Sequence, residues 1–191
     1  MVLAAALAGY MVSLQLARGT PQLASGTTLP TPRPVTPFTL TDQHGASFGN
    51  AQLLGKPHLV FFGFTHCPDV CPTTLALMAQ LLRDPELAHL RMLFITVDPQ
   101  RDDQQTLLRY VEAFGGGFAG LRGADDQLDL LMNNLGAARS IAPRVGTDYA
   151  VDHSATLFYI NSRAAFSAVF TPPYELEKLR SDLVALVDSD Y

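Results

Sequence analysis

The chain has 191 residues and a formal net charge of -5, and hydrophobic residues make up 48% of it. This size fits one domain with additional segments, and the acidic balance without a Lys/Arg cluster excludes an electrostatic surface for nucleic acid. The chain has only two cysteines, Cys67 and Cys71, too few for a disulfide-stabilised secreted module. We therefore expect the cysteines to form a functional site.

The first 18 residues are mostly apolar, and residues 2–17 carry no charge. They are short for a membrane span of about 17–25 residues and lack the basic n-region of a signal peptide. However, the Pro/Thr/Gly/Ser-rich residues 19–36 that follow resemble an extended linker rather than part of a core. This arrangement favours a hydrophobic anchor or signal-like segment at residues 1–18 over a core helix. Residues 37–191 then form the folded domain.

Within this domain, strands are expected to alternate with helices. Residues 38–48 predict a hairpin, and the apolar runs 58–64 and 91–97 are typical of strands buried on both faces of a sheet. Apolar residues at helical spacing predict helices over 73–83, 104–114 and 125–135. Residues 137–150 look irregular, 154–160 and 165–170 predict adjacent strands, and a last helix follows Pro172 and Pro173.

This order of elements indicates an α/β fold with a sheet that contains parallel strands and is covered on both faces. A thioredoxin-like fold with an N-terminal β-hairpin fits the order. The cysteines would follow a central strand, at the sheet edge where such folds place their sites.

The prolines around the cysteines predict their local structure. Pro72 is tolerated only in the first turn of a helix, so the helix should begin between Val70 and Pro72, with Cys71 at its N-terminus and Cys67 in the loop. The amide dipoles there would lower the pKa of Cys71, and we expect both sulfurs to be close together and partly exposed. Such a pair can serve as a disulfide redox centre or as a clasp for a soft metal; buried, inert thiols are the remaining alternative.

A metal held by two sulfurs needs a further ligand, which directs attention to the five histidines. His44 lies in the hairpin turn, and His58 and His89 are expected to be structural or surface residues. His66, directly before Cys67, is a spare ligand or a proton carrier. His153 precedes a buried strand and can reach the cysteines if the loops gather at one end of the sheet; a core histidine is the alternative.

The number of soft donors indicates which metal would fit. Structural zinc normally takes four ligands, and the chain has no third cysteine. Cu(I) accepts a trigonal set of soft donors, so two thiolates and one imidazole favour copper.

Three sequence blocks, "GFTHCPDVCPTTL", "TVDPQRD" and "VDHSATLFYI", in this order and at these separations, resemble the Sco/SenC family of copper proteins. The resemblance covers about residues 38–187. It implies a thioredoxin-like domain that is tethered to the bacterial inner membrane and faces the periplasm, or to the mitochondrial inner membrane and faces the intermembrane space. It also implies that Cys67, Cys71 and His153 bind copper, as Cu(I), Cu(II) or both. Asp98 would shape the surroundings of the site, and Asp152 would tune or position the loop of His153.

By this resemblance, the protein would assist assembly of the binuclear copper centre in subunit II of cytochrome c oxidase. It would donate copper, reduce the cysteines of that subunit, or do both, and further partners would be another periplasmic copper chaperone or a thioredoxin-like reductant. A copper metallochaperone needs His153, whereas a thiol–disulfide oxidoreductase needs only the redox-active pair Cys67 and Cys71. Peroxide reduction is a third alternative, but it requires an Arg, and none lies near Cys67 in sequence.

Overall fold

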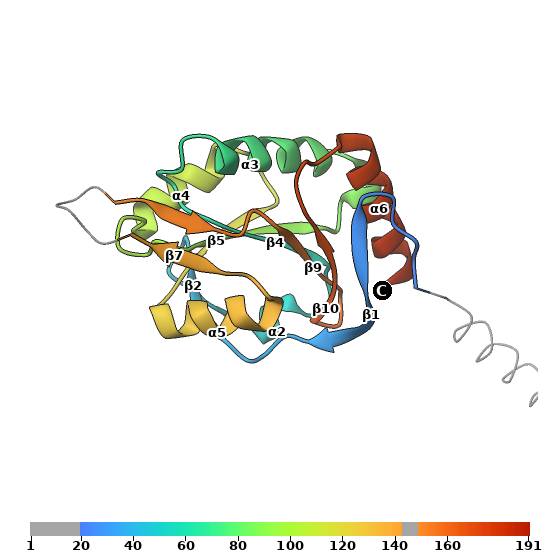
Figure 1. The fold of residues 1–191 in the computed structure, drawn as a ribbon, viewed down its shortest axis with the longest axis horizontal. Coiled ribbons are helices and arrows are strands. Elements are labelled where there is room, and N and C mark those ends of the chain that lie inside the picture. The colour runs from blue at the N-terminus through green and yellow to red at the C-terminus, as the bar shows by residue number, and fades with distance from the viewer. Residues whose placement is uncertain (1–19, 143–148) are drawn as a thin grey trace, which may run out of the picture.

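Strands and helices alternate along the chain in the computed structural model, which describes residues 20–142 and 149–191 (Figure 1). The strands are β1 (Gly26–Pro34), β2 (Thr39–Asp42), β3 (Ser47–Gly49), β4 (His58–Gly63), β5 (Arg91–Thr96), β6 (Phe118–Arg122), β7 (Arg139–Ile141), β8 (Val151–His153), β9 (Leu157–Ile160) and β10 (Ala165–Phe170). The helices are α2 (Asn50–Leu53), α3 (Val70–Leu81), the 3-10 helix η1 (Pro85–Leu87), α4 (Gln104–Glu112), α5 (Asp125–Leu135) and α6 (Leu176–Ser189).

Eight of these strands form a mixed sheet in the order β1-β10-β9-β4-β5-β6-β2-β3. β4 pairs parallel with β5 and antiparallel with β9, so it lies in the centre of the sheet. Strands β7 and β8 form a separate antiparallel ribbon. The carboxyl ends of β4 and β5 therefore lie at the same edge of the sheet, and the cysteine segment begins there.

The sheet is the middle layer of three. Helices α3, α4 and α6 cover one face and α5 and α2 the other, as Figure 1 shows. All six residues of β4 are buried, and because side chains alternate along a strand, Leu59 and Phe61 join the core under α3 while Val60 and Phe62 join the core over α5. Burial on both faces explains the continuous apolar run, and the predicted α/β architecture is confirmed.

The linker predicted for residues 19–36 is wrong for residues 26–34. These residues form β1, which pairs antiparallel with β10 at one edge of the sheet. An edge strand needs hydrogen bonds on one side only and tolerates proline, and the register of β1 shifts between Thr28 and Arg33, around Pro30 and Pro32. The strand was mistaken for a linker because its frequent prolines are typical of extended, unpaired segments.

The other predicted elements agree with the structure, which adds three short strands together with α2 and η1. The hairpin is formed by β2 and β3, with Gly45 at a φ of +87° in its turn. Strand β6 was not expected, and the stretch 137–150, predicted to be irregular, contains β7. His153 was expected at the end of a loop and lies instead in β8. All of these additional strands are short, so they carry little periodic signal.

The predicted anchor at residues 1–18 lies outside the described residues. Among the residues that the structure describes, no helix is both long and apolar enough to cross a membrane.

Candidate metal site

The two cysteines lie where β4 leads into α3, as predicted from Pro72. Cys67 is in the connecting loop and Cys71 is in the first turn of α3. The Cys67 amide donates to the Phe64 carbonyl at 3.2 Å, and the Cys71 amide donates to Cys67 Sγ at 3.4 Å. The backbone thus folds the loop so that the first sulfur sits against the start of the helix.

His153 reaches this loop from β8. Its Nε2 lies 3.5 Å from Cys71 Sγ, and its Nδ1 lies 3.2 Å from the Ser154 carbonyl oxygen. A carbonyl oxygen only accepts hydrogen bonds, so Nδ1 carries the proton and the lone pair of Nε2 faces the sulfur. This backbone contact holds the ring in the tautomer that a metal ligand needs.

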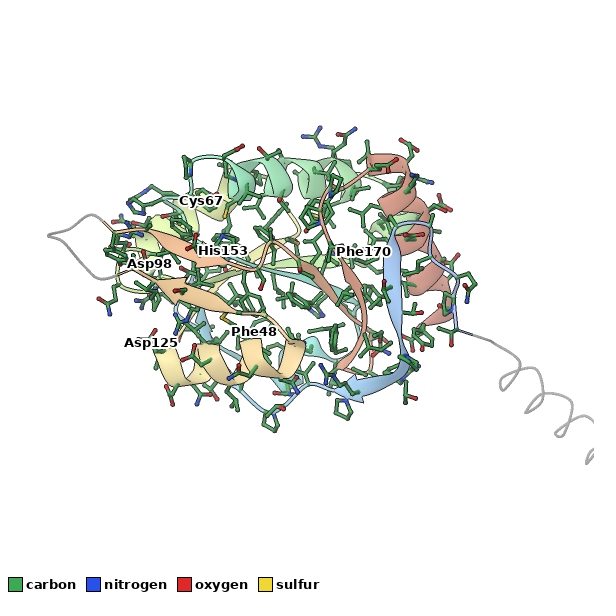
Figure 2. All side chains as sticks on the ribbon, in the orientation of Figure 1. Phe48, Cys67, Asp98, Asp125, His153 and Phe170 are labelled. Atoms are coloured by element: carbon green, nitrogen blue, oxygen red, sulfur yellow. The ribbon has the colours of Figure 1, made fainter. Side chains whose placement is uncertain are left out.

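The three side chains form one compact group of potential ligand atoms. Cys67 Sγ, Cys71 Sγ and a ring nitrogen of His153 lie within 4.8 Å of one another, and no comparable group of three occurs elsewhere in residues 20–142 and 149–191. Figure 2 shows Cys67 and His153 at the same end of the domain, far from Phe170. The structure therefore brings together the three residues selected from the sequence.

Aromatic rings and one glycine shape the space around these atoms. The His153 ring packs edge-on against Phe61 and Phe64, with centroids 6.0 and 5.8 Å away. A Cβ on Gly63 would lie 2.8 Å from Cys71 Sγ, closer than side-chain atoms normally approach. The absence of a side chain at position 63 thus gives the Cys71 sulfur its place. Gly63 could not be singled out from the sequence, because only the fold brings it close to Cys71.

Burial dominates the electrostatics of the site and corrects two predictions. Cys71 is fully buried, whereas Cys67 is partly exposed. Burial raises the pKa of the Cys71 thiol above its ordinary value, so the lowering predicted from the helix N-terminus is wrong, as is the expectation that both sulfurs are partly exposed. Burial also lowers the pKa of His153, so its imidazole is neutral and able to bind a metal at neutral pH.

The two aspartates predicted to surround the site differ in role. Asp98 is buried, accepts from the Tyr149 hydroxyl at 2.5 Å and pairs with the Arg101 guanidinium. Arg101 in turn lies over the Phe64 ring, 5.6 Å from its centroid. Asp98 thus supports the ring that packs on His153 and is not one of the three grouped ligands. Asp152 is exposed, and its charge raises the pKa of His153 against the stronger effect of burial.

The other histidines are divided between surface and core. His44 and His89 are exposed and His58 is buried, while His66 is exposed beside the site without belonging to the three-atom group. Asp102 was not among the residues singled out from the sequence. Only Asp103 caps α4, whereas the fully buried Asp102 faces the cysteine loop. Its place in "TVDPQRD" was the available signal.

This fold and group of atoms define a class: a thioredoxin-like α/β domain that carries a two-sulfur, one-nitrogen cluster suited to a soft metal. The chain belongs to the SCO1/SenC family, whose model matches residues 27–188.

Individual relatives agree with this assignment. The chain is 35% identical over 165 residues to a protein of Stutzerimonas stutzeri named for copper binding, which covers 85% of this chain and 81% of that protein. It is 37% identical over 135 residues to the mitochondrial SCO2 homolog of Mus musculus, covering 68% of this chain and 53% of the longer relative.

Solved structures of relatives show the same fold. The copper-bound ScoI of Bradyrhizobium japonicum matches with a TM-score of 0.70 at 34% identity, over 78% of this chain and 97% of that one. Copper-bound yeast Sco1 matches with a TM-score of 0.76 at 32% identity, over 83% and 90%.

Proposed function

We propose that this protein is a copper metallochaperone that binds copper through Cys67 Sγ, Cys71 Sγ and His153 Nε2. The observation that carries the proposal is the convergence of these three atoms within 4.8 Å. Two sulfurs and one neutral imidazole form a soft donor set that suits Cu(I), while zinc normally requires a fourth ligand. Relatives at 34% and 32% identity have been solved with copper bound, which supports copper as the cargo here.

The chain's own groups prepare the site for the ion. The Ser154 carbonyl fixes the His153 tautomer, and Phe61 and Phe64 limit the positions of the ring. The cysteine thiols lose their protons when the metal binds, because thiolates are the ligands. The partly exposed Cys67 offers a route for ligand exchange with another protein.

The proposed biological task is assembly of the binuclear copper centre in subunit II of cytochrome c oxidase. The family resemblance supports this task, with a second copper chaperone or a thioredoxin-like reductant as a further partner. In the same proposal, residues 1–18 tether the domain to the bacterial inner membrane with its site facing the periplasm. A mitochondrial setting facing the intermembrane space is the alternative.

Copper X-ray absorption of the purified, reduced and Cu(I)-loaded chain tests the ligand set. We expect two sulfur neighbours and one nitrogen neighbour. Replacing His153→Ala should remove the nitrogen and weaken Cu(I) retention by at least about tenfold. Unchanged affinity and an unchanged spectrum in this variant would contradict the proposal.

A thiol–disulfide reductase is the second candidate, favoured by the contact between the Cys71 amide and Cys67 Sγ that keeps the two thiols together. This activity needs both cysteines but not His153. Equal turnover of a disulfide substrate with and without His153, together with weak copper retention in both proteins, would favour the reductase. If the chain is a copper carrier, oxidation to the disulfide should block Cu(I) uptake and reduction should restore it.

A further inference from the structure

His66 is an exposed residue between the buried strand β4 and Cys67. Its side chain is 52% exposed, yet one of its ring nitrogens is held by the protein. His66 Nδ1 lies 3.1 Å from Thr65 Oγ1 and 3.5 Å from Asp102 Oδ1. This arrangement distinguishes His66 from a histidine that contacts only solvent.

The hydrogen bonds of Asp102 determine which nitrogen of His66 carries the proton. Thr65 Oγ1 donates its single proton to Asp102 Oδ1 at 2.6 Å. The other oxygen, Oδ2, accepts from the Thr65 amide at 2.9 Å and from Thr96 Oγ1 at 2.6 Å. Because the Thr65 hydroxyl has no second proton to give, it can only accept from His66. Nδ1 is therefore the protonated nitrogen, and Nε2 has the lone pair.

This arrangement matches the one that protein metal ligands use. A metal-binding histidine almost always donates its second ring N–H to a carboxylate, a carbonyl or water, which fixes the ring and makes the free nitrogen more basic. In His66, Nδ1 donates to the Thr65 hydroxyl, which donates in turn to the buried Asp102, and Asp102 Oδ1 itself lies 3.5 Å from Nδ1. Imidazole nitrogen is a suitable donor for copper, so His66 is prepared as a ligand although it lies outside the three-atom group.

His66 is more exposed to solvent than the three grouped residues, which places it on the outer side of the site. Cys71 is fully buried, and the His153 ring packs against Phe61 and Phe64. Cys67 and His153 are both partly exposed, and His66, which directly precedes Cys67, is more exposed than either. An ion that arrives from another protein can thus reach the exposed His66 before it reaches the fully buried Cys71.

We propose that His66 Nε2 is a transfer ligand that takes Cu(I) from an incoming thiolate carrier and passes it, through Cys67, to the inner site. The inference rests on the proposed copper function. The Cu–S bond to the carrier breaks as the bond to Nε2 forms. The Cu–Nε2 bond then breaks as copper binds the two cysteines and His153. Copper stays in the Cu(I) state throughout, and the thiol protons pass to the buffer.

The first test uses the copper-free protein. Long-range 1H–15N correlation spectra of the full chain should show His66 with its proton on Nδ1. The Thr65→Val variant, which removes the relaying hydroxyl, should shift the ring toward a mixture of tautomers. A wild-type ring protonated on Nε2 would overturn the inference, because that nitrogen could then not accept copper.

The second test measures copper transfer from Cu(I)–glutathione to the full chain in a stopped-flow instrument. His66→Gln keeps a hydrogen-bond donor for Thr65 but removes the ring nitrogen. We expect it to load roughly tenfold more slowly, with its final Cu(I) affinity changed much less. His66→Asn should behave in the same way. His89→Gln is the matched control, because this exposed histidine lies just before β5, at the opposite end of the sheet.

The outcomes separate this inference from the proposed function. Loading of His66→Gln at the wild-type rate overturns the transfer role alone. A loss of affinity as large as the loss of rate also overturns it, because His66 would then be a resident ligand or a structural residue. Wild-type protein that takes up no Cu(I) would overturn the copper function itself, and the transfer role with it.

Discussion

Cys71 Sγ lies 3.5 Å from His153 Nε2, although 82 positions separate the two residues in the chain. The pairing of two strands produces this contact. β9 runs antiparallel to β4, with Leu157 opposite Phe61, so the chain enters β9 beside the end of β4. The residues just before β9, including His153, therefore meet the loop that follows β4. The topology of the sheet, rather than local sequence, closes the site.

The close approach at Gly63 gives the first prediction. In Gly63→Ala, the new Cβ would lie 2.8 Å from Cys71 Sγ and 2.7 Å from Phe94 Cε2. We expect a loss of about 1–3 kcal/mol in the free energy of unfolding, because the surrounding core is already packed. Displacement of the sulfur should also weaken Cu(I) binding. Urea unfolding and a Cu(I) competition assay measure the two effects.

Gly116→Ala is the matched control, since nothing lies within 4 Å of a Cβ built at that position. It should leave copper affinity unchanged and alter stability little. Equal effects of the two substitutions would show that the space beside Cys71 is not limiting.

The raised pKa of Cys71 predicts how copper affinity depends on pH. Burial keeps this thiol protonated at neutral pH, so Cu(I) must displace its proton. The apparent affinity should therefore rise with pH, by about tenfold per pH unit for each proton released. Competition with a Cu(I) chelator whose own protonation is known, from pH 6 to 8, measures the slope. An affinity independent of pH would mean that the thiol is already ionised in the copper-free protein.

The central strands and the position of the two cysteines could be predicted because their signals are local, whereas the pattern left His153 open and the resemblance to the Sco/SenC family selected it. The apolar run of β4 and Pro72 after Cys71 are visible in short windows, but no short window shows that the loop of His153 meets the loop of the cysteines. The protonation of Cys71 was predicted wrongly, because the helix dipole is a local feature whereas burial depends on how α3 packs on the sheet. The contact of Asp102 with Thr65 likewise depends on β4 and β5 lying side by side, and no short window of sequence contains it.

The segment before β1 supplies another prediction. The buried carboxylate of Asp182, in α6, accepts from the amides of Ala24, Ser25 and Gly26 at 2.6, 2.8 and 3.0 Å, and from Ser25 Oγ at 2.7 Å. Asp182→Ala removes the acceptor for all of these donors, which should cost about 2 kcal/mol or more in unfolding free energy. Hydrogen exchange should also become faster in β1.

The exposed Asp188 in the same helix offers a control. Asp188→Ala should leave both the unfolding free energy and the exchange of β1 close to wild type. Slow exchange of β1 in Asp182→Ala would indicate that pairing with β10 alone holds this strand.

The buried His58 predicts a loss of stability in mild acid. Its pKa is lowered from 6.5 to about 4, mainly by burial, with smaller contributions from the nearby charges of Arg91 and Lys56. Below about pH 6.5 the unfolded chain binds a proton on His58 that the folded protein does not accept until about pH 4. The free energy of unfolding should therefore fall as the pH decreases through this window, by up to about 3 kcal/mol.

Urea unfolding of wild type and His58→Leu at several pH values between 4 and 7 measures this effect. Leucine does not titrate and suits a position that is 3% exposed, so the variant should lose less stability than wild type across the same window. Carboxyl groups also titrate between pH 4 and 7, but both proteins share them. The difference between the two losses in unfolding free energy therefore reports His58. If both proteins lose stability in parallel, protonation of His58 does not weaken the fold. The folded protein would then admit water to His58, at the end of the sheet opposite the cysteines, with little loss of stability.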